Sequence, residues 1–209
     1  MAAAPVMPQL TPQQQYIMSE FNGQTYEPNR MDVQDTPLYD TVAFAAGATV
    51  TTAASYLFTN VQGKTLAQTN MKGSQRLNAP EAFTIKSYRF YWQQNILLAD
   101  LYALIMGASA AVLEFYIGNK SYQQGPLWLY APGGGPFPFS TQTAFGFINN
   151  GLPGRQEMNR IAINLVIDNQ ASFYAQLNTT GLALTTTANG GSGFTYQLVL
   201  SGLYARGVQ

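Results

Sequence analysis

Apolar and polar residues alternate with a period of two along most of the chain after residue 40, and Gly, Asn and Pro separate the alternating runs. This period is typical of β-strands that bury one face. The runs cover residues 41–59, 82–92, 111–118, 126–130, 160–168, 172–177 and 193–200. The pattern therefore predicts a strand-rich domain.

Two of these runs predict finer detail. Within residues 82–92, apolar side chains occupy odd positions up to Ile85 and even positions from Tyr88 onward, so we expect a β-bulge near Lys86 and Ser87. Residues 160–168 place an isoleucine or leucine at every odd position from 161 to 167 and end in the turn-forming pair Asp168-Asn169. We therefore expect residues 172–177 to be the hairpin partner of this strand.

A different spacing occurs at residues 96–106, where apolar positions recur as on one face of a helix and Gly107 provides a C-cap. One short helix among many strands and long Gly/Pro loops is typical of an all-β fold. The predicted fold class is a jelly-roll-like antiparallel β-sandwich.

Residues 1–40 differ from the rest of the chain, because they contain a glutamine run, few β-formers and five prolines, namely Pro5, Pro8, Pro12, Pro28 and Pro37. We interpret them as an extended N-terminal arm for contact between subunits, with the sandwich domain at residues 41–209. A disordered tail is the alternative. Thr11 as N-cap and Pro12 at the first helical position predict a short helical turn at residues 13–20.

Composition excludes several classes of function. The chain has no Cys and no His, which removes disulfides, thiolate nucleophiles, Cys/His zinc sites and histidine general bases. Ten basic and ten acidic residues give a net charge of zero, and the basic residues are scattered singly, so no nucleic-acid binding is expected. A weakly charged surface also does little to discourage association, and we expect the chain to assemble with copies of itself.

Carboxylates form two weak candidate sites. Asp32, Asp35 and Asp40 are close enough in sequence for a calcium site, but they lack the spacing of an EF-hand, and an Asp-rich turn is the favoured interpretation. Asp100 and Glu114 are a conceivable glycosidase pair, but both fall on polar faces and are better explained as solvated side chains. We therefore expect no enzyme activity, no metal, no cofactor and no membrane span.

The segment LWLYAPGGGPFPF at residues 127–139 is the strongest candidate for contact with a ligand or a neighbour. Long loops of this kind usually serve function or contact. Because low charge with exposed aromatic residues is typical of interface cores, contact with a neighbouring subunit is favoured over stacking against a sugar. The candidate residues are Trp128, Tyr130, Gly133, Gly134, Gly135, Phe137 and Phe139.

Short motifs distributed after residue 50 carry a resemblance to a known group of proteins. They are YLFTN at 56–60, GKT at 63–65, TNM at 69–71, YIGNKSY at 116–122, PLW at 126–128, GGG at 133–135 and GLYARGVQ at 202–209. In this order they resemble structural proteins of bacteriophage virions, which are capsid or capsid-decorating proteins often built on a jelly roll.

The resemblance implies a virion protein of the phage head, made in the host cytoplasm and without catalytic residues. Its partners would be copies of itself, in a trimer or a capsid lattice, and other capsid proteins. The alternative is a carbohydrate- or receptor-binding β-sandwich, such as a phage spike or a lectin-like module, which would use Trp128, Tyr130 and the glycine loop.

Overall fold

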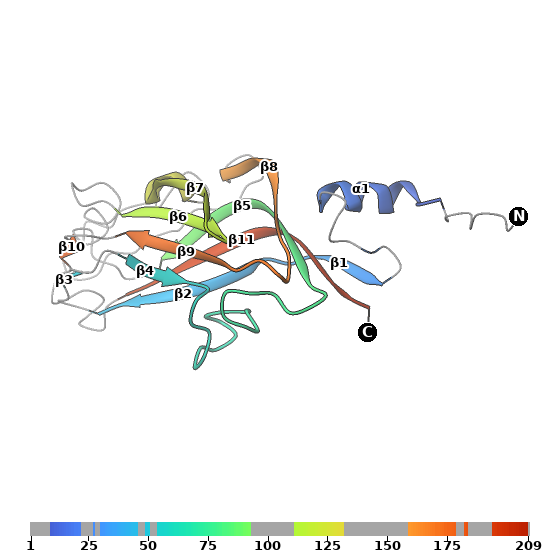
Figure 1. Cartoon of the computed structure of the whole chain (residues 1–209). Helices are drawn as coiled ribbons and strands as arrows, with labels where there is room; N and C mark the ends of the chain where they lie inside the picture. Colours follow the sequence, from blue (N-terminus) through green and yellow to red (C-terminus); the bar gives the residue numbers. More distant parts are fainter. Residues whose placement is uncertain are drawn as a thin grey trace, which may run out of the picture.

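The computed structural model describes residues 9–21, 27, 30–45, 49–50, 54–92, 111–131, 159–178, 182–183 and 194–208, and structural statements below refer to these residues. They form an all-β sandwich with one short α-helix at one end of it (Figure 1). The elements are α1 (Pro12–Glu20), β1 (Met31–Asp35), β2 (Leu38–Phe44), β3 (Thr49–Val50), β4 (Ala54–Leu57), β5 (Ala82–Trp92), β6 (Val112–Ile117), β7 (Lys120–Pro126), the 3-10 helix η1 (Leu127–Tyr130), β8 (Asn159–Ile167), β9 (Phe173–Asn178), β10 (Leu182–Ala183) and β11 (Phe194–Gly207).

The order of the strands identifies the type of sandwich. The first sheet runs β2-β11-β5-β8, with β1 also paired to β11, and the second runs β4-β9-β6-β7. When β1, β3 and β10 are left out, the remaining strands can be numbered 1 to 8 along the chain. The first sheet then has the order 1-8-3-6, and the second sheet has the order 2-7-4-5. All pairs are antiparallel. This is the strand order of a jelly roll, so the predicted fold class is confirmed.

The predicted bulge lies at Lys86. On β5, Ile85 and Ser87 pair with successive residues of β11, and the register with β8 also shifts between Ile85 and Ser87. Lys86 is therefore the extra residue against β11, whereas against β8 the longer unpaired stretch, residues 161–164, lies on β8. The shift changes the parity of the strand, which is why Ile85 and Tyr88 are both fully buried although they lie an odd number of positions apart.

Gly202 lies opposite the bulge and permits a close approach of two strands. A Cβ atom at this position would lie 1.9 Å from the carbonyl oxygen of Thr84. The obstructing atom belongs to the backbone, so a side-chain rotation cannot relieve the clash. β11 therefore needs a glycine where its register with β5 shifts.

A core of aliphatic and large aromatic side chains fills the space between the two sheets. Tyr88 of β5 packs edge-on against Phe115 of β6, with ring centroids 5.3 Å apart, and Phe115 lies 6.3 Å from Phe173 of β9. Large aromatic side chains bury much apolar area, so these contacts join the sheets effectively. The fully buried aromatic residues are Phe21, Phe58, Phe83, Tyr88, Phe90, Phe115, Tyr130, Phe173 and Tyr196, and Phe21 lies in a separate, smaller cluster.

The segment between β4 and β5 covers the free edge of β2. The Asn70 side chain donates to the carbonyl oxygen of Pro37 at 2.7 Å and accepts from the Tyr39 amide at 3.0 Å. The Thr41 hydroxyl donates to the carbonyl oxygen of Gln68 at 2.7 Å. Polar groups of the edge strand are thus paired within the chain, which removes a site where another chain would add as a strand.

The domain boundary that the sequence predicted at residue 40 does not coincide with the end of an element. Residues 31–35 and 38–40 belong to β1 and β2, so the expected boundary at residue 40 falls inside a strand of the first sheet. The predicted helical turn is present as α1. Thr11 is its N-cap, and its hydroxyl accepts from the Gln14 amide while the Gln14 side chain accepts from the Thr11 amide.

Three further expectations differ from the structure or fall outside it. The Asp168 turn is present, because its Oδ1 accepts from the amides of Gln170 and Ala171, but β9 then pairs with β4 and β6 rather than with β8. Residues 127–130 form η1 and not a strand: the Leu127 amide still donates to the carbonyl oxygen of Ala111 at 2.9 Å, but the Ala131 amide then donates to the carbonyl oxygen of Trp128 at 3.3 Å, the i→i+3 bond of a 3-10 turn. The helix expected at residues 96–106 lies outside the described residues.

The burial of every second residue that the sequence predicted for β8 is only partly present. Its register with β5 breaks between Leu165 and Arg160, so the residues between them do not follow one face. Ile163 is consequently 66% exposed, whereas Leu165 and Ile167 are buried as predicted.

Candidate functional site

The aromatic candidates of residues 127–139 separate into an exposed and a buried side chain. Trp128 on η1 is 53% exposed, whereas Tyr130 is fully buried with its ring centroid 6.1 Å from that of Tyr88. Burial raises the pKa of Tyr130, consistent with a core residue. Tyr130 therefore offers no stacking surface. The other candidates, Gly133, Gly134, Gly135, Phe137 and Phe139, lie outside the described residues.

The acidic residues considered for a calcium site, near the start of the sandwich, do not form a common site. Asp32 and Asp35 lie on β1 rather than in a turn, and Asp40 is fully buried on β2. Asp40 accepts from Lys64 Nζ at 2.8 and 2.9 Å and from the Phe58 amide at 2.6 Å. Its role is structural, and the described residues contain no cluster of acidic side chains suited to a metal ion.

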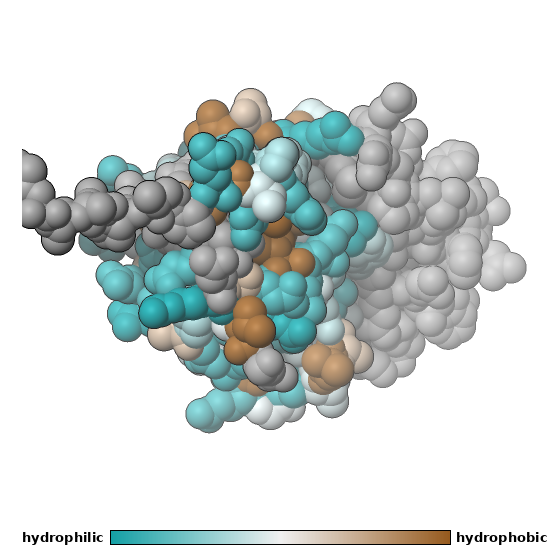
Figure 2. Space-filling view, turned by 90° about the vertical axis from the view of Figure 1, so that its right-hand side faces the viewer, coloured by the Kyte–Doolittle hydropathy of each residue, from teal (hydrophilic) through white to brown (hydrophobic). Residues whose placement is uncertain are grey.

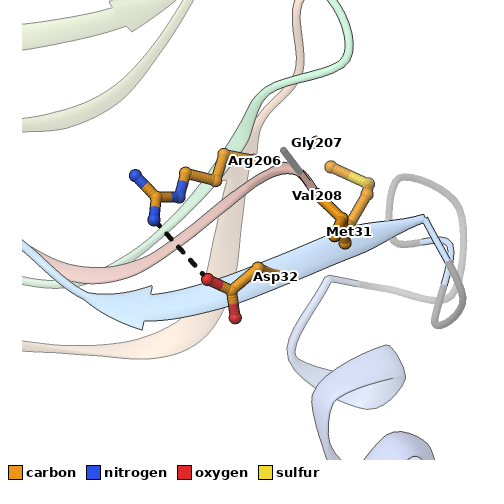
Figure 3. Close-up of a pocket in the computed structure, with 5 residues that line it drawn as sticks. All are labelled: Met31, Asp32, Arg206, Gly207 and Val208. Carbon is orange, nitrogen blue, oxygen red and sulfur yellow. Dashed lines mark ion pairs between the residues drawn. The ribbon is translucent and has the colours of Figure 1, made fainter.

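A shallow hollow of about 360 Å³ lies where β1 begins and β11 ends (Figure 3). It is lined by Met31, Asp32, Arg206, Gly207 and Val208. Asp32 and Arg206 face each other across 3.7 Å, and both side chains are about half exposed. The two charges offset each other, so the hollow holds no uncompensated group that would act as an acid, a base or an anion receptor.

The most organised polar surface lies on the outer face of the second sheet. Glu114 is on the side of β6 opposite the buried Leu113 and Phe115, as predicted. Its Oε1 accepts from Gln124 Nε2 at 2.8 Å and from Asn178 Nδ2 at 3.2 Å, and its Oε2 accepts from the Tyr116 hydroxyl. The bond to Glu114 stabilises the protonated phenol and raises the pKa of Tyr116 to about 12. The other predicted carboxylate, Asp100, lies outside the described residues.

Three tyrosines form a row beside this carboxylate. Tyr116 of β6 is paired in register with Tyr174 of β9, and their rings stack with centroids 4.8 Å apart at an angle of 10°. Tyr56 of β4 extends the row, with its centroid 6.1 Å from that of Tyr174. The name tyrosine face is used below for this surface, which comprises Tyr56, Glu114, Tyr116, Gln124, Tyr174, Gln176 and Asn178.

A second organised contact joins the helix to the outer face of the first sheet. Phe21, the C-cap of α1, is fully buried against Met31, Ala82 and Ala205. This contact places the C-terminal end of the helix over β1, β5 and β11.

Polar contacts hold the same end of the helix. The Thr84 hydroxyl donates to the carbonyl oxygen of Glu20 at 2.8 Å, and Lys86 Nζ donates to the Glu20 carboxylate and, at 3.0 Å, to Asn164 Oδ1. Burial lowers the pKa of Lys86. The bulge therefore directs its extra residue to the docked helix. The name helix dock is used below for Phe21, Glu20, Thr84, Lys86 and Asn164.

Comparisons with protein-family models, with curated proteins and with solved structures found no match. Function is therefore argued from the geometry of these surfaces. In the part of the chain that the structure describes, no helix has both the length and the apolar character needed to cross a bilayer.

Sequence reasoning did not find the tyrosine face. Its members come from four strands, of which only β6 and β7 are neighbours in the chain, so no local motif unites them. The signal was the parity of two runs: Glu and Tyr occupy positions 114 and 116, and Tyr, Gln and Asn occupy positions 174, 176 and 178, while positions 113, 115, 175 and 177 are apolar. Only the jelly-roll order of the strands places these two runs side by side.

Proposed function

We propose that the protein is a structural protein of a bacteriophage virion, which assembles in or on the icosahedral head as a capsid subunit or as a cement protein. The observation that carries the proposal is the jelly-roll strand order, because this architecture recurs in viral capsid domains. A fold does not specify a function, so the proposal also depends on the scarcity of charge and on the resemblance of the short motifs.

Exposed hydrophobic side chains indicate where neighbouring subunits would touch. Tyr16 on α1 is 60% exposed, and Trp128 and Leu129 on η1 are 53% and 42% exposed. Aromatic residues are enriched at interfaces. At the end of the sandwich where α1 and β1 lie, hydrophobic residues form small patches separated by hydrophilic ones (Figure 2). Several modest contacts repeated by symmetry suit such a surface better than one large interface.

Surface charge supports the same role. Charged residues make up 10% of the chain, against about 25% in typical soluble domains. Weak self-repulsion favours close packing of many copies. The balanced charge also favours a position that does not contact packaged nucleic acid.

The test is the size of the assembly formed by the full chain alone, measured by light scattering after size exclusion and by negative-stain microscopy. We expect either shells, which would indicate a lattice-forming subunit, or a closed oligomer such as a trimer, which would indicate a cement protein. Trp128→Ala is expected to reduce the assembled fraction, whereas Leu66→Ala, at a residue 75% exposed in the β4-β5 segment, serves as the control. A chain that stays monomeric at every concentration would overturn the proposal.

A further inference from the structure

We propose that the tyrosine face is a binding site for a neutral saccharide chain. This function goes beyond assembly, because it would let the protein attach to a glycan-coated surface. It also uses residues other than Trp128, Tyr130 and the glycine loop.

The first requirement of such a site is a row of aromatic rings. Tyr56, Tyr174 and Tyr116 lie on the adjacent strands β4, β9 and β6, so their row crosses the sheet. Tyr116 and Tyr174 stack on each other with centroids 4.8 Å apart, so the faces they turn toward each other are covered, and the tilted ring of Tyr56 lies 6.1 Å from that of Tyr174. The C–H groups of a sugar pack against the negative face of a tyrosine ring, so the ring faces that remain open are the contact surface. Tyr56 is half exposed and gives the row its most accessible ring.

The second requirement is hydrogen-bonding groups held in place beside the rings. Glu114 Oε2 accepts one hydrogen bond, from Tyr116, and a carboxylate oxygen has capacity for another from a sugar hydroxyl. Gln176 Nε2 donates to Asn178 Oδ1 at 2.7 Å, and Asn178 in turn donates to Glu114. This network fixes the side chains before a ligand arrives, which lowers the entropic cost of binding.

The charge of the tyrosine face favours neutral ligands over anionic ones. The tyrosine face contains one carboxylate and no basic side chain. A nucleic acid, or a sugar that carries carboxylate or sulfate groups, would be repelled by Glu114 and would find no cation in this set of residues. A neutral glycan has no such penalty.

Polarity favours a glycan over a second copy of the chain. Glu114, Gln124, Gln176 and Asn178 are joined to one another by hydrogen bonds, whereas the cores of subunit interfaces are depleted of charge and more apolar. The exposed Trp128 and Leu129, which suit a protein partner, lie on η1 outside the tyrosine face.

The experiment measures binding of the full chain to immobilised linear oligosaccharides of glucose, mannose, galactose and N-acetylglucosamine, with calorimetry on any that bind. Heparin is the anionic comparison. We expect at least one neutral oligosaccharide to bind, and we expect Tyr56→Ala and Tyr174→Ala each to weaken it roughly tenfold. Glu114→Gln keeps the shape of the side chain but removes its charge, and it should weaken binding without changing the thermal midpoint greatly.

Matched controls separate the possible outcomes. Leu66→Ala, in the β4-β5 segment, and Ile163→Ala, on β8 of the first sheet, change exposed hydrophobic residues outside the tyrosine face and should leave binding unchanged. Loss of binding in Trp128→Ala alone would move the site to η1 and overturn the proposal, as would a preference for heparin or the absence of any neutral ligand. If Tyr56→Ala instead changes the mass of the assembly, the tyrosine face is a subunit interface. The assembly of the wild-type chain, measured separately, tests the virion proposal independently of glycan binding.

Discussion

Asp40 binds the β4-β5 segment to the first sheet. Its buried carboxylate accepts from Lys64, whose side chain is 21% exposed, and from the amide of Phe58. Phe58 adopts a positive φ of 66°, which is unfavourable for a bulky residue. The bond from its amide to Asp40 and the burial of its ring hold this conformation, so one carboxylate fixes both the ammonium group and a strained backbone position.

Asp40→Ala is expected to destabilise the protein by about 3 to 5 kcal/mol, because it leaves a partly buried ammonium group and a buried amide without their acceptor. The measurement is the free energy of unfolding from urea denaturation. Asp32→Asn is the matched control, because it breaks an ion pair that is about half exposed, and it should cost less than about 1 kcal/mol. Equal losses in the two variants would contradict the structural role of Asp40.

Gly202→Ala tests the close approach of β11 to β5. The new Cβ would lie 1.9 Å from the backbone oxygen of Thr84, so the strands must separate, and we expect a loss of about 3 kcal/mol or more in the free energy of unfolding. Gly73→Ala is the control, because the nearest atom to its Cβ would be the Arg76 oxygen at 3.6 Å. A Gly202→Ala protein as stable as this control would contradict the close approach of β11 to β5 at the bulge.

At the scale of elements, α1 is attached to the sandwich through its last turn. Phe21 supplies the apolar contact and Glu20 the polar ones, while Tyr16 remains 60% exposed. A short helix is marginal in isolation, so its stability depends on the helix dock.

Phe21→Ala is therefore expected to release α1 while the sandwich stays folded. Hydrogen exchange followed by mass spectrometry should show loss of protection at residues 12–20 and retained protection in β5 and β11. Tyr16→Ala should leave both patterns unchanged. If protection of the strands falls together with that of α1, the helix is an integral part of the sandwich rather than an attached element.

Local pattern predicted the elements that depend on neighbours in sequence. The change of parity after Ile85 predicted the bulge, and Thr11 with Pro12 predicted the start of α1. The hairpin expected for β8 and β9 was wrong because the chain crosses to the other sheet after the Asp168 turn, and a turn motif does not say which sheet the next strand joins. The tyrosine face was missed for the same reason, since its neighbours are set by the order of strands.

At the scale of the whole molecule, the core contains several buried phenols. Tyr88, Tyr130 and Tyr196 are fully buried, and burial raises the pKa of each above its ordinary value of 10.0. Below pH 10 these phenols are neutral in the folded and in the unfolded protein. Above it they ionise in the unfolded chain first, so the unfolded state is favoured as the pH rises.

These three phenols should therefore lower the free energy of unfolding by up to about 4 kcal/mol per pH unit above about pH 10, since each contributes about 1.4 kcal/mol, and Tyr116 and Tyr204, whose pKa values are also raised, add to this slope. Urea denaturation between about pH 9 and about pH 11 gives this slope, and phenolate absorbance shows whether these phenols ionise only on unfolding. Tyr88→Phe removes one ionisable phenol and should reduce the slope of the free energy of unfolding against pH by about 1.4 kcal/mol per pH unit. A slope that does not change in this variant would contradict the assignment.

The pairing of β1 with β11 has a mechanical consequence. Met31 lies opposite Gly207 in an antiparallel register, and β2 continues along the same strand as far as Phe194. Tension applied between residues 31 and 207 would load these hydrogen bonds in succession, as in a zipper, instead of together in shear. The first sheet would then peel apart at low force from this corner. If the proposed virion role holds, strain from internal pressure would have to cross the faces of the sandwich rather than pass through these two points.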